Sequence, residues 1–229
     1  MKTIVQTPTP DLEASLSFYS DLGFKPITNS NPHLLTDGKV LMEVNPDRFA
    51  RAGIKMFSDD WGDTVDKLKE LTAVTKTSGG YILSDFSGAW IYLMNSEGPA
   101  HEVTEVSYSA LGNYAGISLE STDIQKSLNL FDILGFSNIV MGSVEQGFVV
   151  TSNEEGTVLS LMKPGACPHL FFNPSLSYFN GTKNVEIIDN LRQLNIPITE
   201  EITHFNPNGD VDNIIVRDPG GFGFFVFSD

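Results

Sequence analysis

The stretch DLEASLSFYSDLGF at residues 11–24 decides the fold, because it recurs as DIQKSLNLFDILGF at residues 123–136. The two copies align without a gap, and six of their fourteen positions are identical. Their offset of 112 residues is about half of the 229-residue chain. Self-similarity at a long fixed offset is typical of a duplicated structural unit. The sequence therefore predicts two similar halves.

Each copy reads as a helix with defined ends. Asp11 and Asp123 stand where an N-cap is expected, since an Asp side chain can accept from the free N–H groups of the first helical turn. Apolar residues follow at spacings of three and four, which predicts one buried face. Gly23 and Gly135 then stand at the helix end, where a positive φ is readily adopted by glycine.

The flanking segments predict the other elements of each half. A strand precedes the helix and about three strand-like runs follow it, and the second part of each half has a similar order. In the last quarter we expect the opening strand at residues 169–172 and the helix near 185–194. The fold class is therefore α+β, with four βαβββ modules in two pairs. A polar segment at residues 96–112 indicates domains of residues 1–108 and 109–229.

The composition excludes several classes of function. Fourteen Lys and Arg against 29 Asp and Glu give a net charge of −15, which repels nucleic acid and anionic membranes. The single cysteine, Cys167, excludes an internal disulfide and fits a reducing compartment. The sequence has no apolar run long enough for a signal peptide or a membrane span. We expect a cytoplasmic soluble protein, either a monomer or a homodimer.

The repeated motif and the segment DPGGF at residues 218–222 resemble the vicinal oxygen chelate superfamily, which includes glyoxalase I, extradiol dioxygenases and bleomycin-resistance proteins. The resemblance covers essentially the whole chain. It implies that paired modules curl their strands into a cup, where His and Glu side chains of the first and last strands hold a divalent metal. One such scaffold serves many activities, so the chemistry has to be read from the residues.

The closing strands lack the metal ligand that the resemblance implies. The family's Glu lies four residues after the turn glycine of a module, which here gives Met42, Tyr92, Ser160 and Phe225. None of these is a carboxylate. Glu43 lies one residue further on, and because side chains alternate faces along a strand, we expect it to point away from the cup unless a bulge shifts the register.

The opening strands offer one candidate ligand. The positions that the family pattern assigns there are Ile4, Gly116, Ala52 or Gly53, and His169. Only the last of these side chains can bind a metal. A catalytic metal usually has three protein ligands. We therefore expect no cofactor, and a divalent metal held by His169 and Glu43 is the alternative.

The remaining residues at the cup positions favour an apolar or planar ligand. Aromatic side chains on the closing strands offer rings for stacking, and a few hydroxyl or amide groups offer hydrogen bonds to a ligand. The candidate pocket residues are Gln6, Met42, Trp90, Tyr92, Ser160, His169 and Phe225.

The leading interpretation is metal-independent binding of a small apolar or aromatic molecule in a sheet-lined cup. Two alternatives stay open. One is a metal-dependent lyase or dioxygenase of the same superfamily. The other is a non-catalytic scaffold whose cups are filled by side chains and which acts through its surface or by dimerisation. The sequence assigns no catalytic residue.

Overall fold

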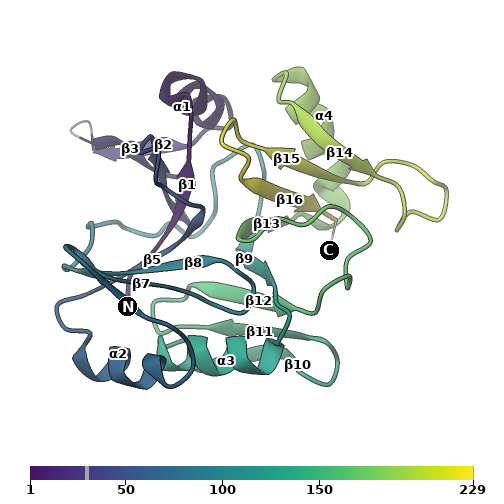
Figure 1. Ribbon diagram of the computed structural model, residues 1–229. Coiled ribbons are helices and arrows are strands. Elements are labelled where there is room, and N and C mark those ends of the chain that lie inside the picture. Colours follow the sequence, from purple (N-terminus) through teal and green to yellow (C-terminus); the bar gives the residue numbers. More distant parts are fainter. Residues whose placement is uncertain (29–30, 229) are drawn as a thin grey trace.

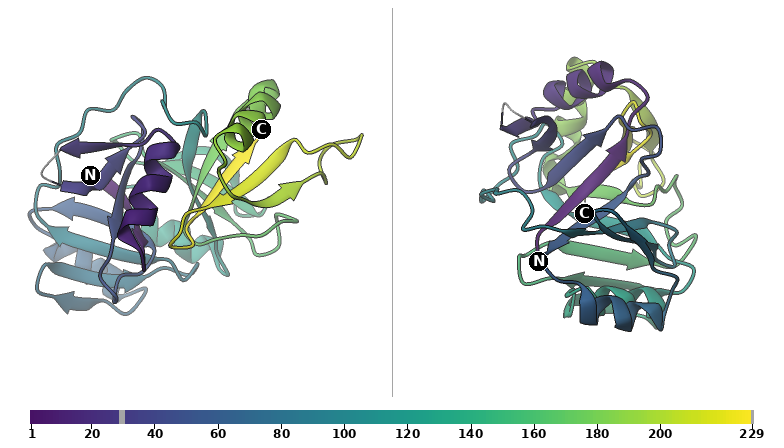
Figure 2. Two further views of the ribbon diagram at one scale, coloured as in Figure 1. Left: turned by 90° about the horizontal axis from the view of Figure 1, so that it is seen from above. Right: turned by 60° about the vertical axis from the view of Figure 1, so that its left-hand side comes forward.

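The computed structural model describes residues 1–28 and 31–228 and contains two eight-stranded sheets, one in each half of the chain (Figures 1 and 2). The elements of the N-terminal half are β1 (Thr3–Pro8), α1 (Leu12–Asp21), β2 (Lys25–Thr28), β3 (Asn31–Thr36), β4 (Leu41–Asn45), β5 (Gly53–Ser58), α2 (Gly62–Lys69), β6 (Thr75–Thr77), β7 (Gly80–Ser84) and β8 (Trp90–Asn95).

The C-terminal half repeats this order and adds one short 3₁₀ helix, η1 (Gly181–Lys183), before its last α-helix. Its other elements are β9 (Tyr114–Glu120), α3 (Ile124–Ile133), β10 (Asn138–Ser143), β11 (Phe148–Ser152), β12 (Val158–Met162), β13 (Ser175–Phe179), α4 (Asn184–Gln193), β14 (Ile198–Ile202), β15 (Asn213–Arg217) and β16 (Gly223–Phe227).

The strand order confirms the predicted α+β fold with four βαβββ modules. The sheets run β2-β3-β4-β1-β5-β8-β7-β6 and β10-β11-β12-β9-β13-β16-β15-β14. The first and last strands of each module are parallel neighbours, and the two modules of a half join through their antiparallel first strands. A strandless segment at residues 96–113 separates the two sheets, and the domain boundary at residue 108 stays a prediction.

The repeated helices have the ends that their sequences predict. The Asp11 and Asp123 side chains accept hydrogen bonds from the backbone N–H groups of Ala14 and Lys126, each at 3.0 Å. The glycines that follow α1 and α3 have positive φ angles of 86° and 90°. In the part of the chain that the structure describes, no helix has the length and apolar character needed to cross a membrane.

One element was predicted in the wrong place. Residues 169–172 form no strand, and the opening strand of the last module is β13, which begins at Ser175. The sequence reading also overlooked two outer strands, β6 and β14. Both outer strands are at least half polar, so they lack the apolar alternation that identifies a strand.

The two halves share one hydrophobic core. Its buried side chains come from both sheets, as Val5 and Met56 do in the first half and Ile117 and Leu159 in the second. Figure 1 shows α2 and α3 side by side at one end of the molecule, with α1 and α4 at the other. The core lies on one face of each sheet, and the opposite face forms the cup.

Buried hydrogen bonds from equivalent turns also join the halves. In every module the residue directly after the third strand is a buried Asp or Asn. Tyr178 of β13 donates to Asp37 at 2.9 Å, and Tyr19 of α1 donates to Asp218 at 2.9 Å. Asp85 is the equivalent residue of the second module, and its carboxylate accepts a hydrogen bond from Ser127 of α3 at 2.9 Å. The modules at both ends of the molecule are thus held together by polar as well as apolar contacts.

Burial affects the ionisation of both partners in these contacts. It raises the pKa of the Asp218 carboxyl, although hydrogen bonds from Phe222, Thr7 and Tyr19 act in the opposite direction. Burial also raises the pKa of the Tyr19 hydroxyl, and the neighbouring Asp218 charge adds to that effect. The tyrosine therefore stays a protonated donor, and the carboxylate depends on such donors to remain buried.

We predict that Tyr19→Phe and Tyr178→Phe each lower the free energy of unfolding by about 1–3 kcal/mol, because each leaves a buried carboxylate short of one donor. Urea unfolding followed by circular dichroism measures the change. Tyr81→Phe is the matched control, since the Tyr81 hydroxyl makes no hydrogen bond to a described residue. Equal unfolding midpoints for all three variants would contradict the structural role of these contacts.

Candidate functional site

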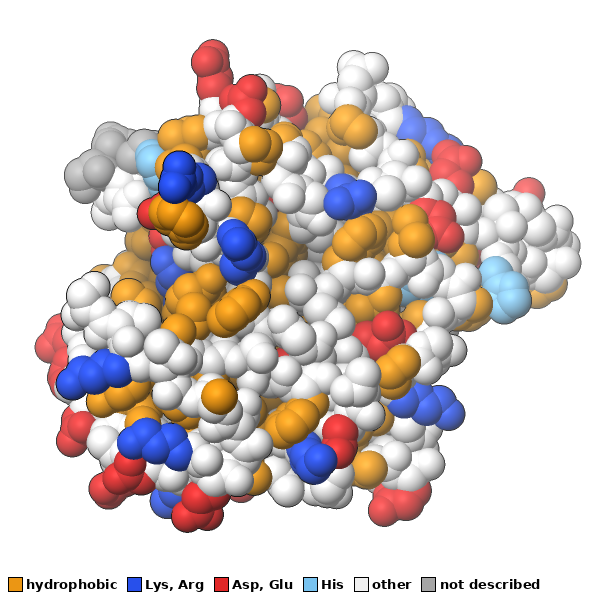
Figure 3. Space-filling model, in the orientation of Figure 1, with side chains coloured by type: hydrophobic (Ala, Val, Ile, Leu, Met, Phe, Trp, Pro, Cys, Tyr) orange, Lys and Arg blue, Asp and Glu red, His pale blue; other side chains and the backbone are white. Residues whose placement is uncertain are grey.

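The N-terminal cup is built on the face of the first sheet that points away from the core. Strand register places Gln6 of β1 opposite Glu43 of β4, and Lys55 of β5 opposite Tyr92 of β8. Residues that pair across neighbouring strands lie on the same face of a sheet. Figure 3 shows this side of the molecule hollowed beside β1 and β5, with basic and hydrophobic side chains around the hollow.

The predicted register of β4 was wrong by one residue. Met42 is opposite Val5, is 0% exposed and belongs to the shared core, so it does not line the cup. Glu43 points into the cup, where the sequence reading had placed Met42. The cause is the turn of this module, in which Gly38 directly follows the buried Asp37, whereas the other three turn glycines come three residues after the equivalent Asp or Asn.

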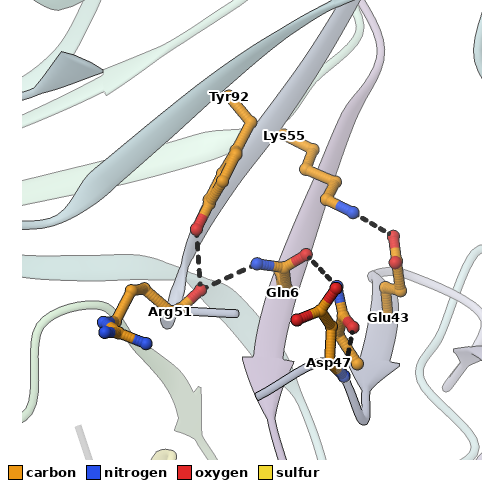
Figure 4. A network of polar contacts seen from close by, with 7 residues as sticks. Gln6, Glu43, Asp47, Arg51, Lys55 and Tyr92 are labelled. Carbon is orange, nitrogen blue, oxygen red and sulfur yellow. Dashed lines mark hydrogen bonds and ion pairs between the residues drawn. The ribbon is translucent and has the colours of Figure 1, made fainter. Parts of the chain in front are cut away.

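Polar side chains in the N-terminal cup bond to one another (Figure 4). The Lys55 ammonium donates to Glu43 Oε2 at 2.7 Å, and their side chains are 12% and 27% exposed. Gln6 Nε2 donates to the Arg51 carbonyl at 2.8 Å, and Gln6 Oε1 accepts from Asn45 at 2.9 Å. The hydrogen-bonding groups of these long side chains are therefore paired with other residues of the cup.

Two predicted aromatic residues also lie at the N-terminal cup. Tyr92 donates through its hydroxyl to the Arg51 carbonyl at 3.3 Å, and its ring centroid lies 5.9 Å from Lys55 Nζ. Burial raises the pKa of the Tyr92 hydroxyl. Trp90 pairs with Gly53 on the same face and is 38% exposed. The structure thus brings Gln6 and Tyr92 together, with Trp90 on the same cup face.

The C-terminal cup has different residues at the equivalent positions. Ser118 of β9 lies opposite Ser160 of β12, and Ser177 of β13 lies opposite Phe225 of β16. The Ser118 and Ser177 hydroxyls are 2.7 Å apart and hydrogen-bonded. No hydrogen bond joins the Ser160 hydroxyl to a residue that the structure describes. Short hydroxyl side chains replace the long charged ones of the other cup.

A cavity of about 380 Å³ occupies the C-terminal cup. Its walls combine aromatic rings with small polar groups and two sulfur atoms. The Phe225 and Phe227 rings stack with centroids 5.6 Å apart, and Phe171 lies 5.0 Å from Phe225. The lining residues are Ser118, Ser160, Met162, Cys167, His169, Phe171, Ser177, Phe179, Phe205, Asn213, Phe225 and Phe227.

His169 reaches this cavity from a loop and not from a strand. The loop joins β12 to β13 and covers the cup. The imidazole lies 5.2 Å from the Phe225 ring and 5.0 Å from the Phe227 ring, and its Nδ1 is 2.8 Å from the Leu170 carbonyl. His169, Ser160 and Phe225 are therefore brought together, but His169 does not occupy the opening-strand position that the sequence assigned to it.

Cys167 lies on the same loop. Its sulfur is 3.8 Å from the Met162 sulfur. Burial raises the pKa of the Cys167 thiol, and the Glu120 charge acts in the same direction. The thiolate is the reactive form of cysteine, so these surroundings disfavour a nucleophilic role.

Neither cup fits the divalent metal that the family pattern implies. In the N-terminal cup, the Lys55 ammonium balances the charge of the Glu43 carboxylate. In the C-terminal cup, the four central positions carry three serines and a phenylalanine. Across residues 1–28 and 31–228, no three His, Cys, Asp or Glu side chains gather to hold a metal ion. Catalytic zinc sites usually have three such ligands.

Sequence reasoning missed Lys55, Ser118, Ser177 and Asn213. Ser118 could have been found from the repeat, because it stands 112 residues after Gln6. Lys55 and Ser177 could not be found in that way, because the second modules of the two halves align poorly in sequence. Only the strand pairing shows that these two residues occupy equivalent positions.

No protein-family profile matches this chain, and no curated protein matches it in sequence. Solved structures do resemble it. A catechol 2,3-dioxygenase superimposes with a TM-score of 0.52 at 13% identity, covering 97% of this chain and 85% of the other. For 2,2',3-trihydroxybiphenyl 1,2-dioxygenase from Sphingomonas wittichii, the TM-score is 0.55 at 14% identity, and the superposition covers 99% of this chain and 91% of that one.

Homoprotocatechuate 2,3-dioxygenase from Arthrobacter globiformis gives a TM-score of 0.56 at 16% identity, covering 97% of this chain and 78% of that one. At these identities the likeness establishes the fold alone. The chain has the two-domain fold of the vicinal oxygen chelate superfamily, as its repeated motif predicted.

We predict that Lys55→Met lowers the free energy of unfolding by about 2 kcal/mol, because it leaves Glu43 largely buried without its partner. The double variant Lys55→Met/Glu43→Leu should lie within about 1 kcal/mol of the wild type, since an apolar pair removes the cost of burying two charges. Urea unfolding measures both.

The control is Lys69→Met, which breaks an exposed ion pair with Asp66 and should change stability by less than about 0.5 kcal/mol. If the double variant is less stable than Lys55→Met alone, the ion pair is not the source of the loss.

Proposed function

We propose that the protein binds a small, uncharged, planar molecule in the C-terminal cup without the help of a metal. The observation that carries this proposal is the cavity of about 380 Å³ that is lined by phenylalanine rings and serine side chains. Ligand pockets are typically concave and apolar, with a few polar groups that fix orientation. The aromatic walls favour a flat apolar ligand because rings gain from stacked or edge-on contact.

The size of the cavity supports a ligand of about two fused or linked rings. An apolar cavity of about 150 Å³ is large enough for one benzene molecule. The volume here is about two and a half times as large. The cavity also lies within the typical range of about 300–1,000 Å³ for ligand pockets.

The polar groups of the cup suit a hydroxyl or carbonyl group on such a ligand. Ser160 offers a hydroxyl that no described residue binds, on the same face as the hydrogen-bonded pair of Ser118 and Ser177. The lining contains no Asp, Glu, Lys or Arg. An uncharged ligand therefore matches this cup better than an ion, since an unpaired charge is costly to bury.

The two alternatives fit the residues less well. A lyase or dioxygenase of the superfamily type needs metal ligands, and Glu43 and His169 lie in different cups. A scaffold role with filled cups does not fit the cavity of the C-terminal cup. The cytoplasmic location and the monomeric or homodimeric state stay predictions.

We predict that 2-naphthol binds the wild-type protein and that Ser160→Phe weakens this binding at least tenfold, because the added ring fills the cavity. Isothermal titration calorimetry in a chelator-containing buffer measures both affinities. Thr75→Phe places the same ring on the exposed strand β6 and is the matched control. Equal affinity of 2-naphthol for the two variants would place the binding site outside this cup.

We also predict that the purified protein contains less than about 0.1 mole of any divalent transition metal per mole of chain. Elemental analysis after purification in metal-containing medium tests this. The expectation follows from the ligand sets of the two cups. A stoichiometric metal that disappears in Glu43→Gln or in His169→Gln would instead support the enzymatic alternative.

A further inference from the structure

A second cavity, of about 170 Å³, lies between the two halves and outside both cups. Its walls come from β1 and the start of β4 in the first half, from β9 and the turn before β12 in the second, and from the connecting segment 99–103. Val5 lines this cavity and points to the core side of β1, whereas Gln6 points into the N-terminal cup.

Two hydroxyl groups at this cavity have no protein partner. Thr3 Oγ1 is the one buried side-chain nitrogen or oxygen, among the residues described, without a hydrogen bond. Leaving such a group unpaired costs about 1–3 kcal/mol. The Tyr114 hydroxyl also makes no hydrogen bond to a described residue, and burial raises its pKa, so it stays a protonated donor. The Tyr114 hydroxyl is therefore free to donate to a molecule in the cavity, whereas Thr3 Oγ1 is covered by protein atoms on all sides.

The charged groups at the cavity favour an anion. Lys2 and Lys39 line it, and neither ammonium forms an ion pair with any residue described. The one lining carboxylate, Glu155, lies 3.5 Å from the N-terminal amine. Burial lowers the pKa of His101, so this ring is neutral near pH 7. Two unpaired lysines therefore gather at one cavity of a chain whose net charge is −15.

The lining also contains aliphatic side chains. Val5 and Ile117 reach the cavity from β1 and β9, one from each half. The volume is close to that of an engineered cavity of about 150 Å³ that holds benzene, so it suits about six to eight non-hydrogen atoms. A ligand of this size can place an anionic group near the lysines and the Tyr114 hydroxyl and a short chain against the aliphatic side chains.

We propose that this cavity binds a short aliphatic carboxylate of about four to six carbon atoms. Lys2 and Lys39 attract the carboxylate, and the Tyr114 hydroxyl donates to it. Charge-assisted hydrogen bonds of this kind are about twice as strong as neutral ones. Because the ligand contacts both halves, its binding stabilises the folded chain in proportion to its concentration.

The test uses sodium butyrate, with butyramide and sodium phosphate as comparison compounds, all at one ionic strength fixed with sodium chloride. Butyramide keeps the chain but lacks the charge, and phosphate keeps a charge but lacks the chain. We expect butyrate to raise the melting temperature in a saturable manner and to bind at least tenfold more tightly than either comparison compound. Equal effects of butyrate and butyramide, or of butyrate and phosphate, would overturn the proposal.

Variants separate the proposed site from a general effect of the solute. Lys39→Gln should weaken butyrate binding at least tenfold, while Lys76→Gln, the same change on the exposed strand β6, should leave it unaltered. Tyr114→Phe removes the hydroxyl that can donate to the ligand, so it should weaken butyrate binding at least threefold. Unchanged butyrate affinity in both Lys39→Gln and Tyr114→Phe would exclude this cavity as the site.

Discussion

The structure depends on a buried Asp or Asn that follows the third strand of every module. One oxygen of each side chain closes its own turn, as Asp218 Oδ1 does by accepting from the Phe222 N–H at 2.7 Å and Asn153 Oδ1 by accepting from Thr157 at 2.9 Å. The other polar atom of the same side chain forms a hydrogen bond with a residue of another module. A buried carboxylate or amide must have such partners, so the turn conformation and the packing of the halves are fixed together.

The two halves resemble one another on one face of each sheet and differ on the other. On the core face, the pair Val5 and Met42 in the first half corresponds to Ile117 and Leu159 in the second, and all four are buried and apolar. Changes of volume in a shared core destabilise both halves at once. On the cup faces, long polar side chains in the first half correspond to serines in the second.

The sequence predicted the features that depend on local or repeated patterns. The capped helices followed from an Asp, an apolar stripe and a glycine, and the module order followed from the repeat. Strand register did not follow, because it depends on turn length. In the first module the turn glycine comes directly after Asp37, so counting from Gly38 assigned Met42 to the cup in place of Glu43.

The position of His169 shows a second limit of sequence reasoning. The segment 169–172 is apolar and resembles a strand, yet β13 is the segment SLSYF at 175–179, in which Ser177 lines the second cup. A buried strand with serines at alternate positions has little of the hydrophobic signal by which strands are identified. Its small side chains are nevertheless the ones that leave room in the cup.

Side-chain length at three equivalent positions accounts for the difference between the cups. In the first cup, Gln6, Glu43 and Lys55 are long, and they bond to one another or to the rim. In the second cup, the three residues are serines. Their side chains are too short to fill the space between the sheet and the phenylalanine rings. The strand order is the same in both halves, and the cavity lies over the sheet that carries the three serines. One fold can thus carry two cups of different chemistry in a single chain, because the residues at a few cup positions decide what each cup holds.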